Sequence, residues 1–165
     1  TGLKFTGMKF VVPTKEQLEA HYNKDDEWYE KKGQRIIEDL ENAGRTPEKP
    51  AIEYGRDIIR TIIAYMTETP VLTLVLEGNQ AVGVVQKLVG TTEPLSADVG
   101  TIRGDFTIDS YGHSTYENRA VKNLIHASDS PEEAEREIAI WFAEGETHEY
   151  VTAQERIMYE AIRNR

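Results

Sequence analysis

The sequence has 165 residues, 39% of them hydrophobic and 29% charged, which fits one globular domain with one core. The formal net charge of −10 excludes a fold-wide basic footprint for nucleic acid, although a small phosphate ligand needs only a few local donors. The absence of cysteine excludes disulfides and thiol nucleophiles, and the longest apolar run, residues 71–76, is too short to cross a bilayer. We therefore expect a cytoplasmic domain that binds neither a membrane nor nucleic acid.

The N-terminal segment has the pattern of a strand followed by a short helix. Apolar and polar side chains alternate over residues 3–12, and a change of phase at Gly7 predicts a β-bulge. Thr14 and Gln17 can form a capping box, which predicts a helix that reaches Tyr22.

The next segment, residues 23–58, is polar and charged. Isoleucine and leucine residues at helical spacing predict one helix that ends at Gly44 and a second over residues 58–66. The near-continuous apolar run over residues 71–77 predicts a buried strand at the centre of a sheet.

The rest of the chain mixes helices, loops and one further strand. Ser130, Pro131 and Glu133 supply an N-cap, a proline at N1 and a glutamate at N3, which predicts a helix start. The other predicted elements are helices over 81–88 and about 152–162, loops over 90–104 and 107–120, and a strand over 121–127. Because strands and helices are mixed, we expect the α+β class.

Residues 123–130 carry the clearest chemical pattern, since a histidine ends the apolar strand just ahead of the capped helix. Helix N-termini attract anions, and neutral imidazole is a competent nucleophile near pH 7. Glu137, two turns into the helix, can orient the imidazole of His126 with Ser128 as a link. From spacing alone, a buried structural histidine explains the pattern equally well.

A second segment, residues 100–106, sets Arg103 in a glycine-rich loop. The guanidinium fork matches phosphate oxygens, which suits a phosphate clamp, although a surface turn with a solvated ion pair explains this segment more simply. No pair of histidines has metal-ligand spacing, and no glycine-rich phosphate-loop motif occurs. The sequence therefore predicts no protein-bound metal.

Taken together, these segments resemble the nucleoside diphosphate kinase family. The stretch NLIHASDSPEEAEREIAIWF is similar to the family's active-site histidine signature and the helix after it. Three other blocks match the family in its own order: GLKFTGMKFVVPTKEQLEAHY, EGNQAVGVVQKLVGTTEP and GTIRGDF. The combination is specific, and it favours a functional histidine at position 126 over a structural one.

The resemblance implies a fold and a reaction. The fold would be one ferredoxin-like domain over residues 1–165, an antiparallel sheet with helices on one face and a helical insertion at about 23–58. The reaction would be a ping-pong transfer of the γ-phosphate from a nucleoside triphosphate such as ATP to a nucleoside diphosphate through phospho-His126. Mg²⁺ would be bound through the nucleotide phosphates, and the protein would form a homo-oligomer.

The resemblance also implies roles for individual residues. His126 would be the nucleophile, oriented by Glu137 and Ser128. The nucleotide contacts would come from these residues: Arg103, Thr92 and Tyr22 at the phosphates, Asn123 at the ribose, and Gln86 at a position where the family usually has arginine.

The chain departs from the family pattern at several places. Gln86 replaces the usual arginine, and the segments 23–58 and 107–120 are longer than in the common form. The family's first strand and its lysine-proline-aspartate motif have no counterpart here, so we expect an upstream portion before Thr1, without which residues 1–165 would be unstable or inactive. A non-catalytic nucleotide-binding or interaction member is the alternative, which Gln86 favours and the intact His126 opposes.

Overall fold

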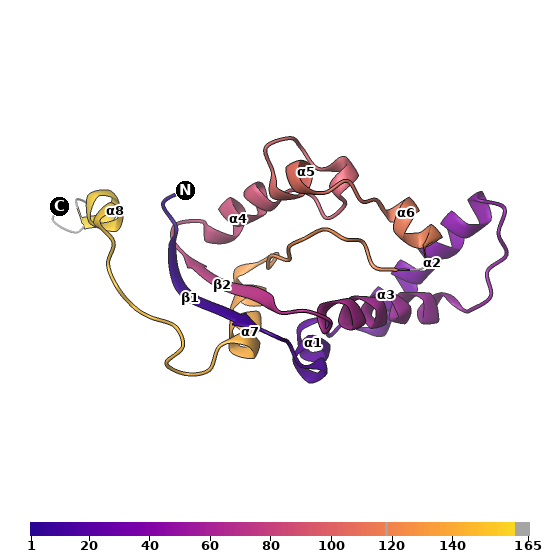
Figure 1. The fold of residues 1–165 in the computed structure, drawn as a ribbon, viewed down its shortest axis with the longest axis horizontal. Helices are drawn as coiled ribbons and strands as arrows, with labels where there is room; N and C mark the ends of the chain where they lie inside the picture. The colour runs from indigo at the N-terminus through magenta and orange to yellow at the C-terminus, as the bar shows by residue number, and fades with distance from the viewer. Residues whose placement is uncertain (118, 161–165) are drawn as a thin grey trace.

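The computed structural model describes residues 1–117 and 119–160 (Figure 1). In chain order the elements are β1 (Lys4–Val11), α1 (Lys15–His21), α2 (Asp26–Asn42), α3 (Ala51–Met66), β2 (Val71–Glu77), α4 (Ala81–Val89), the 3₁₀ turn η1 (Pro94–Ser96), α5 (Ile102–Phe106), α6 (Tyr111–Tyr116), α7 (Pro131–Trp141), α8 (Ala153–Glu155) and the π turn η2 (Arg156–Glu160). Within the described ranges, every helix is too short or too polar to cross a membrane.

β1 and β2 form an antiparallel two-stranded sheet. The register shifts between Phe5 and Gly7, which confirms the predicted bulge. At Gly7 a Cβ atom would lie 2.8 Å from the ring of Phe142, just after α7. The glycine therefore lets the end of α7 approach the bulged strand closely.

The two faces of this sheet have different surroundings. Val75 in β2 is buried in the core, whereas Leu72 in β2 and Phe10 in β1 are 56% and 76% exposed. The prediction that β2 is buried on both sides is therefore wrong for the described chain. Successive side chains of a strand point to opposite faces, and here the helices cover one face.

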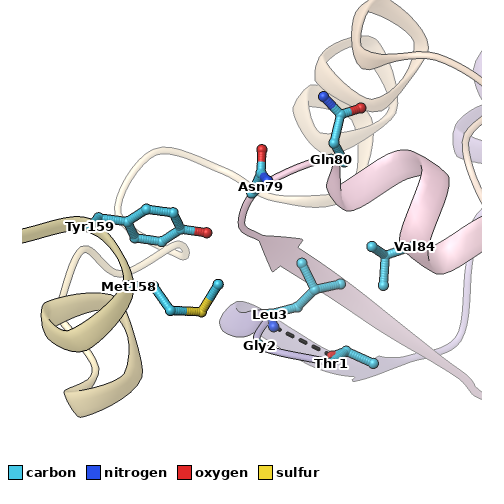
Figure 2. A pocket seen from close by; sticks show the side chains of 8 residues that line it. All are labelled: Thr1, Gly2, Leu3, Asn79, Gln80, Val84, Met158 and Tyr159. Atoms are coloured by element: carbon cyan, nitrogen blue, oxygen red, sulfur yellow. Dashed lines mark hydrogen bonds between the residues drawn. The ribbon is translucent and has the colours of Figure 1, made fainter. Parts of the chain in front are cut away.

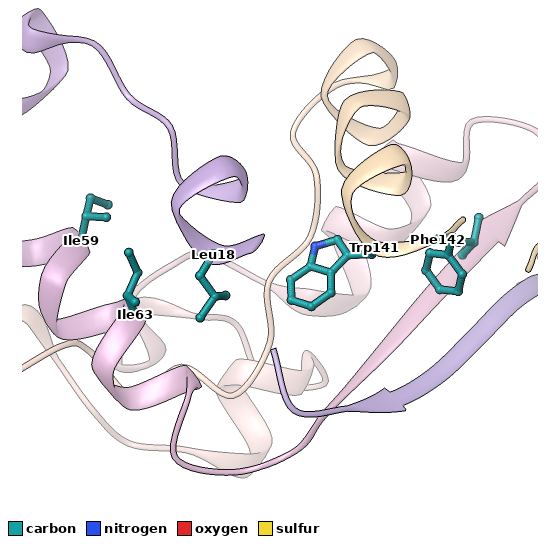
Figure 3. Packing of buried hydrophobic residues seen from close by; sticks show 6 residues of the cluster. Leu18, Ile59, Ile63, Trp141 and Phe142 are labelled. Carbon is teal, nitrogen blue, oxygen red and sulfur yellow. The ribbon is translucent and has the colours of Figure 1, made fainter. Parts of the chain in front are cut away.

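The core lies where α1, α3 and α7 meet the covered face of the sheet (Figure 3). Leu18 of α1 is completely buried, between the isoleucines of α3 and the indole of Trp141. Burial of a leucine side chain is worth about 1.5–3 kcal/mol. This packing sets the end of α1 against α7, which matters for the site described below.

α2 and α3 lie side by side and touch through glycine. A Cβ atom on Gly33 would lie 1.6 Å from the carbonyl oxygen of Ala51, and one on Gly55 would lie 2.0 Å from that of Tyr29. Only glycine permits so close an approach of two helix backbones. Both predicted helices of this region are confirmed, and α2 ends before Gly44, which has a left-handed φ of 70°.

The predicted strand over 121–127 is wrong in the described structure. Its backbone is irregular, with Leu124 in the left-handed region at a φ of 66°. The carbonyls of Asn123 and Ile125 accept hydrogen bonds from Arg103 instead of from a neighbouring strand. A strand needs a ladder partner, and side-chain donors satisfy these carbonyls here.

Both predicted loops contain short helices. Thr101 caps α5 by accepting from Gly104 N, and Ser110 caps α6 by accepting from His113 N. These local side-chain caps explain why helical turns form in polar sequence. At the C-terminal end, Thr152 forms the predicted helix start, but α8 continues as the π turn η2, and the last predicted residues lie outside the described ranges.

We expect Gly33→Ala to destabilise the protein by about 3 kcal/mol, because the new methyl group collides with backbone that cannot move aside cheaply. Urea unfolding followed by circular dichroism measures the change. Gly83→Ala in α4 is the matched control, because no atom beyond its own stretch of helix lies within 4 Å of its Cβ position, and alanine favours a helix by about 0.5–1 kcal/mol. Equal stability of the two variants would contradict the tight crossing.

Candidate active site

His126 and Ser128, in the segment before α7, meet Glu137 of α7. Nε2 of His126 lies 2.9 Å from Oε1 and 3.1 Å from Oε2 of Glu137. The hydroxyl of Ser128 donates to Oε2 of the same carboxylate at 2.5 Å. The structure therefore brings together the three residues that were predicted to act as one unit.

The carboxylate fixes which nitrogen of His126 is available. A carboxylate only accepts, so Nε2 carries the hydrogen and Nδ1 keeps its lone pair. The side chain of His126 is 41% exposed, whereas that of Glu137 is 8% exposed. An unprotonated Nδ1 on a partly exposed ring that is held through Nε2 is the arrangement that a nucleophilic histidine needs.

Glu137 remains ionised despite its burial. Burial raises the pKa of its carboxyl, but hydrogen bonds from His126 and Ser128 lower it, and the net shift is downward. Arg136 adds a cation 3.8 Å from Oε1 of Glu137. The same guanidinium donates to the backbone carbonyls of Ala20 and His21, so it ties α7 to the end of α1.

His21 belongs to this cluster, although sequence reasoning placed it only at the end of a helix and assigned it no role in the site. It is 4% exposed, its ring centroid lies 4.5 Å from that of His126, and its Nε2 lies 3.7 Å from Oε1 of Glu137. Nε1 of Trp141 donates to Nδ1 of His21 at 3.1 Å. Burial, together with the neighbouring His126, lowers the pKa of His21 to about 4, so the ring is neutral near pH 7.

Nitrogen and oxygen atoms of His21, His126 and Glu137 lie within 4.8 Å of one another, close enough to consider a metal site. The hydrogen bonds do not fit one. Because Trp141 only donates, Nδ1 of His21 must accept, and the hydrogen of the neutral ring stays on Nε2. Metal binding at that nitrogen would move the hydrogen to Nδ1, facing the indole N–H.

Tyr22, the residue after His21, also faces the cluster. Its ring centroid lies 6.0 Å from that of His126, and its hydroxyl donates to Sδ of Met66 at 3.3 Å. Burial raises the pKa of Tyr22 to about 12, so the phenol stays protonated. Tyr22 therefore lies at the predicted site, with a neutral side chain.

Gln86 of α4 supports the turn that follows His126. Its Nε2 lies within hydrogen-bond distance of the carbonyls of Ala127 and Ser128, at 3.0 and 2.9 Å, and of Oδ1 of Asp129, at 3.1 Å. One amide nitrogen thus contacts three oxygens of a single turn. Gln86 thus lies at the site, but its amide N–H groups are directed at oxygens of the protein.

Arg103 is buried in α5 rather than exposed on a loop. Its guanidinium donates to the carbonyls of Gly90, Asn123 and Ile125, at 2.9, 3.4 and 2.5 Å. Burial lowers its pKa. Arg103 therefore joins the segment before His126 to the end of α4.

Asn123 and Thr92 lie in this same region. Nδ2 of Asn123 donates to the carbonyl of Thr92 at 3.1 Å, which joins the segment before His126 to the loop after α4. Thr92 is exposed. Hydrogen bonds thus link Thr92, Asn123, Arg103 and Gln86 to the segment around His126. Tyr22 lies near the ring of His126 without such a bond.

A cavity of about 250 Å³ lies apart from this cluster (Figure 2). The chain start, the turn after β2, the first part of α4 and the C-terminal turn line it with these residues: Thr1, Gly2, Leu3, Asn79, Gln80, Val84, Met158 and Tyr159. None of them is a predicted site residue. The cavity therefore does not belong to the histidine cluster.

Comparisons with known proteins agree with this geometry. A family model described as nucleoside diphosphate kinase matches residues 50–147. A nucleoside diphosphate kinase of Pyrobaculum aerophilum is 45% identical over 153 residues, which is 90% of this chain and 84% of the relative. One of Methanobrevibacter smithii is 39% identical over 142 residues, which is 80% of this chain and 83% of the relative.

Solved structures give the same result. The Pyrobaculum aerophilum NDP kinase superposes with a TM-score of 0.83, over 90% of this chain and 84% of that one, at 45% identity. The Borrelia burgdorferi enzyme, solved as a transition-state mimic with vanadate and ADP, has a TM-score of 0.74 at 30% identity and covers 96% of this chain and 80% of that one. The predicted α+β, ferredoxin-like fold is confirmed. The chain belongs to the nucleoside diphosphate kinase family and is a phosphotransferase of that family.

Proposed function

We propose that Nδ1 of His126 carries the phosphoryl group between nucleotides. The observation that supports this assignment is the engagement of Nε2 by Glu137, which leaves the other ring nitrogen unprotonated on an exposed side chain. The nucleotides in the Borrelia burgdorferi and Halobacterium salinarum structures, ADP with vanadate and CDP, indicate the class of ligand.

The transfer occurs in two balanced steps. The lone pair of Nδ1 attacks the γ-phosphorus of a nucleoside triphosphate, and the bond to the bridging oxygen breaks, so the diphosphate leaves with the electron pair. The phosphorylated imidazole keeps its hydrogen on Nε2 and gains positive charge, which the carboxylate of Glu137 stabilises. A terminal oxygen of the acceptor diphosphate then attacks phosphorus, and Nδ1 of His126 leaves.

The proposed nucleotide contacts are those that the family resemblance implies for the other site residues. Arg103 and Thr92 contact the phosphates, and Asn123 contacts the ribose. Tyr22 contributes a neutral phenol beside the phosphoryl group, which adds no negative charge near the phosphates. Gln86 holds the turn after His126 in place.

Mg²⁺ bound through the nucleotide phosphates would neutralise their charge during transfer. The protein groups that fit this arrangement are donors rather than anionic ligands. Arg103 contributes a guanidinium, while the carboxylate of Glu137 accepts from His126 and Ser128. This chain therefore contributes positioning of the phosphates rather than a carboxylate cage.

The whole described chain is proposed to act as one domain, with residues 23–58 as a helical insertion. The family match begins at residue 50, and α2 packs along α3. The homo-oligomer and the cytoplasmic location stay predictions.

A coupled assay of phosphate transfer from ATP to a second nucleoside diphosphate tests the activity directly. Transfer with ping-pong kinetics separates an active member from a non-catalytic nucleotide-binding member. Saturable nucleotide binding without transfer would favour the non-catalytic alternative, for which the replacement of a family arginine by Gln86 is the argument.

We expect His126→Ala to abolish the phosphoenzyme and to reduce transfer by at least about a thousandfold, because the nucleophile is removed. Incubation with γ-labelled ATP should label the unmodified protein with phosphate that is lost in acid and persists in base. His148→Ala is the matched control, since that histidine is exposed. A base-stable phosphate label on the His126→Ala variant would contradict the assignment of His126 as the phosphorylated residue.

We expect Gln86→Arg to raise kcat/KM by about tenfold, because a charge-assisted donor replaces a neutral one beside the phosphates. A charge-assisted hydrogen bond contributes about 1–3 kcal/mol, and a tenfold change lies within that range. Steady-state kinetics measures the change. Gln34→Arg adds the same charge at an exposed position of α2 and should leave kcat/KM unchanged. An unchanged or lower value for Gln86→Arg would mean that the turn after His126 depends on glutamine.

A further inference from the structure

His21 ends α1 in the middle of an aromatic and charged group. Its ring makes edge contacts with the rings of His126, Tyr22 and Trp141, at centroid distances of 4.5, 4.6 and 5.7 Å. The side chain is 4% exposed. Each nitrogen of a buried imidazole needs a polar partner. The two nitrogens of His21 have different partners.

Trp141 fixes the tautomer of His21. Indole Nε1 is a donor only, so the 3.1 Å hydrogen bond requires a lone pair on Nδ1 of His21. In the neutral ring the hydrogen must then lie on Nε2. That nitrogen faces Oε1 of Glu137 at 3.7 Å, too long for a hydrogen bond but close enough for attraction between an N–H dipole and a carboxylate.

We propose that His21 is a positioning residue of the transfer reaction. Trp141 sets its tautomer, its Nε2–H turns toward the carboxylate of Glu137, and its ring edge limits rotation of His126. This inference rests on the proposed role of His126, and it adds a chain of contacts, Trp141 to His21 to Glu137, behind the nucleophile.

The neutral form of His21 matters for this role. A cationic ring would compete with His126 for the charge of Glu137, whereas a neutral N–H adds a third directed dipole beside the bonds from His126 and Ser128. The carboxylate then stays ionised and in one orientation. A carboxylate and a nucleophile held in one geometry lose less free energy to reorganisation when charge develops.

Three variants separate positioning from mere packing. His21→Leu fills the space but has no donor, and Trp141→Phe keeps a ring but removes the indole N–H. His21→Gln can accept from Trp141 through its oxygen and donate toward Glu137 through its nitrogen, so it restores both contacts. His148→Gln, at an exposed histidine, is the matched control.

Two measurements carry the test: the single-turnover rate of acid-labile phosphate formation with ATP and Mg²⁺, and the ADP dissociation constant. We expect His21→Leu to slow phosphorylation about tenfold or more with an unchanged dissociation constant, and His21→Gln to recover to within about threefold of the unmodified protein. Nitrogen-15 NMR of labelled histidine should show His21 protonated on Nε2, and Trp141→Phe should remove that preference.

The outcomes are distinguishable. If the unmodified protein forms no phosphohistidine, both the proposed function and this inference fail. If it does and His21→Leu phosphorylates at the same rate, only the inference fails. Protonation of His21 on Nδ1 in the unmodified protein, or an unchanged tautomer in Trp141→Phe, would also overturn it. If His21→Leu does not fold, His21→Gln and Trp141→Phe still decide the question.

Discussion

The carboxylate of Glu137 is the acceptor on which the site depends. Two directed hydrogen bonds end on it, from His126 and from Ser128, and a neutral ring and a guanidinium face it from the direction of α1 and α7. An ionised carboxylate with 8% exposure costs free energy unless donors surround it. The surrounding donors therefore stabilise the ion, and the ion in turn orients the histidine.

The fold supplies these donors from distant parts of the chain. α1 and α7 meet because Leu18 and Trp141 share the core, and Arg136 joins the helices again through backbone carbonyls. The indole of Trp141 belongs to both the core and the site, since its ring packs in the core and its N–H donates to His21. Stability and site geometry thus depend on the same contacts.

The sequence predicted what is local and missed what is distant. His126, Ser128 and Glu137 lie within twelve positions, and a capped helix fixes their spacing, so the motif alone implied their contact. The partner of His21 lies 120 residues away, and no periodicity reports such a pair. The strand over 121–127 failed for the same reason, because apolar spacing predicts a strand but cannot predict its ladder partner. Arg103 was recognised as important, yet its carbonyl partners needed the structure.

The glycine contacts between α2 and α3 limit how this region can diversify. Two backbones in contact leave no room for a side chain at Gly33 or Gly55, so relatives that keep this crossing must keep both glycines or separate the helices together. The connection over residues 43–50 is largely exposed, and length changes there alter loop-closure entropy only slightly. Natural variation and engineered insertions should therefore occur in the connection between α2 and α3, while the glycine contacts between the two helices stay constant.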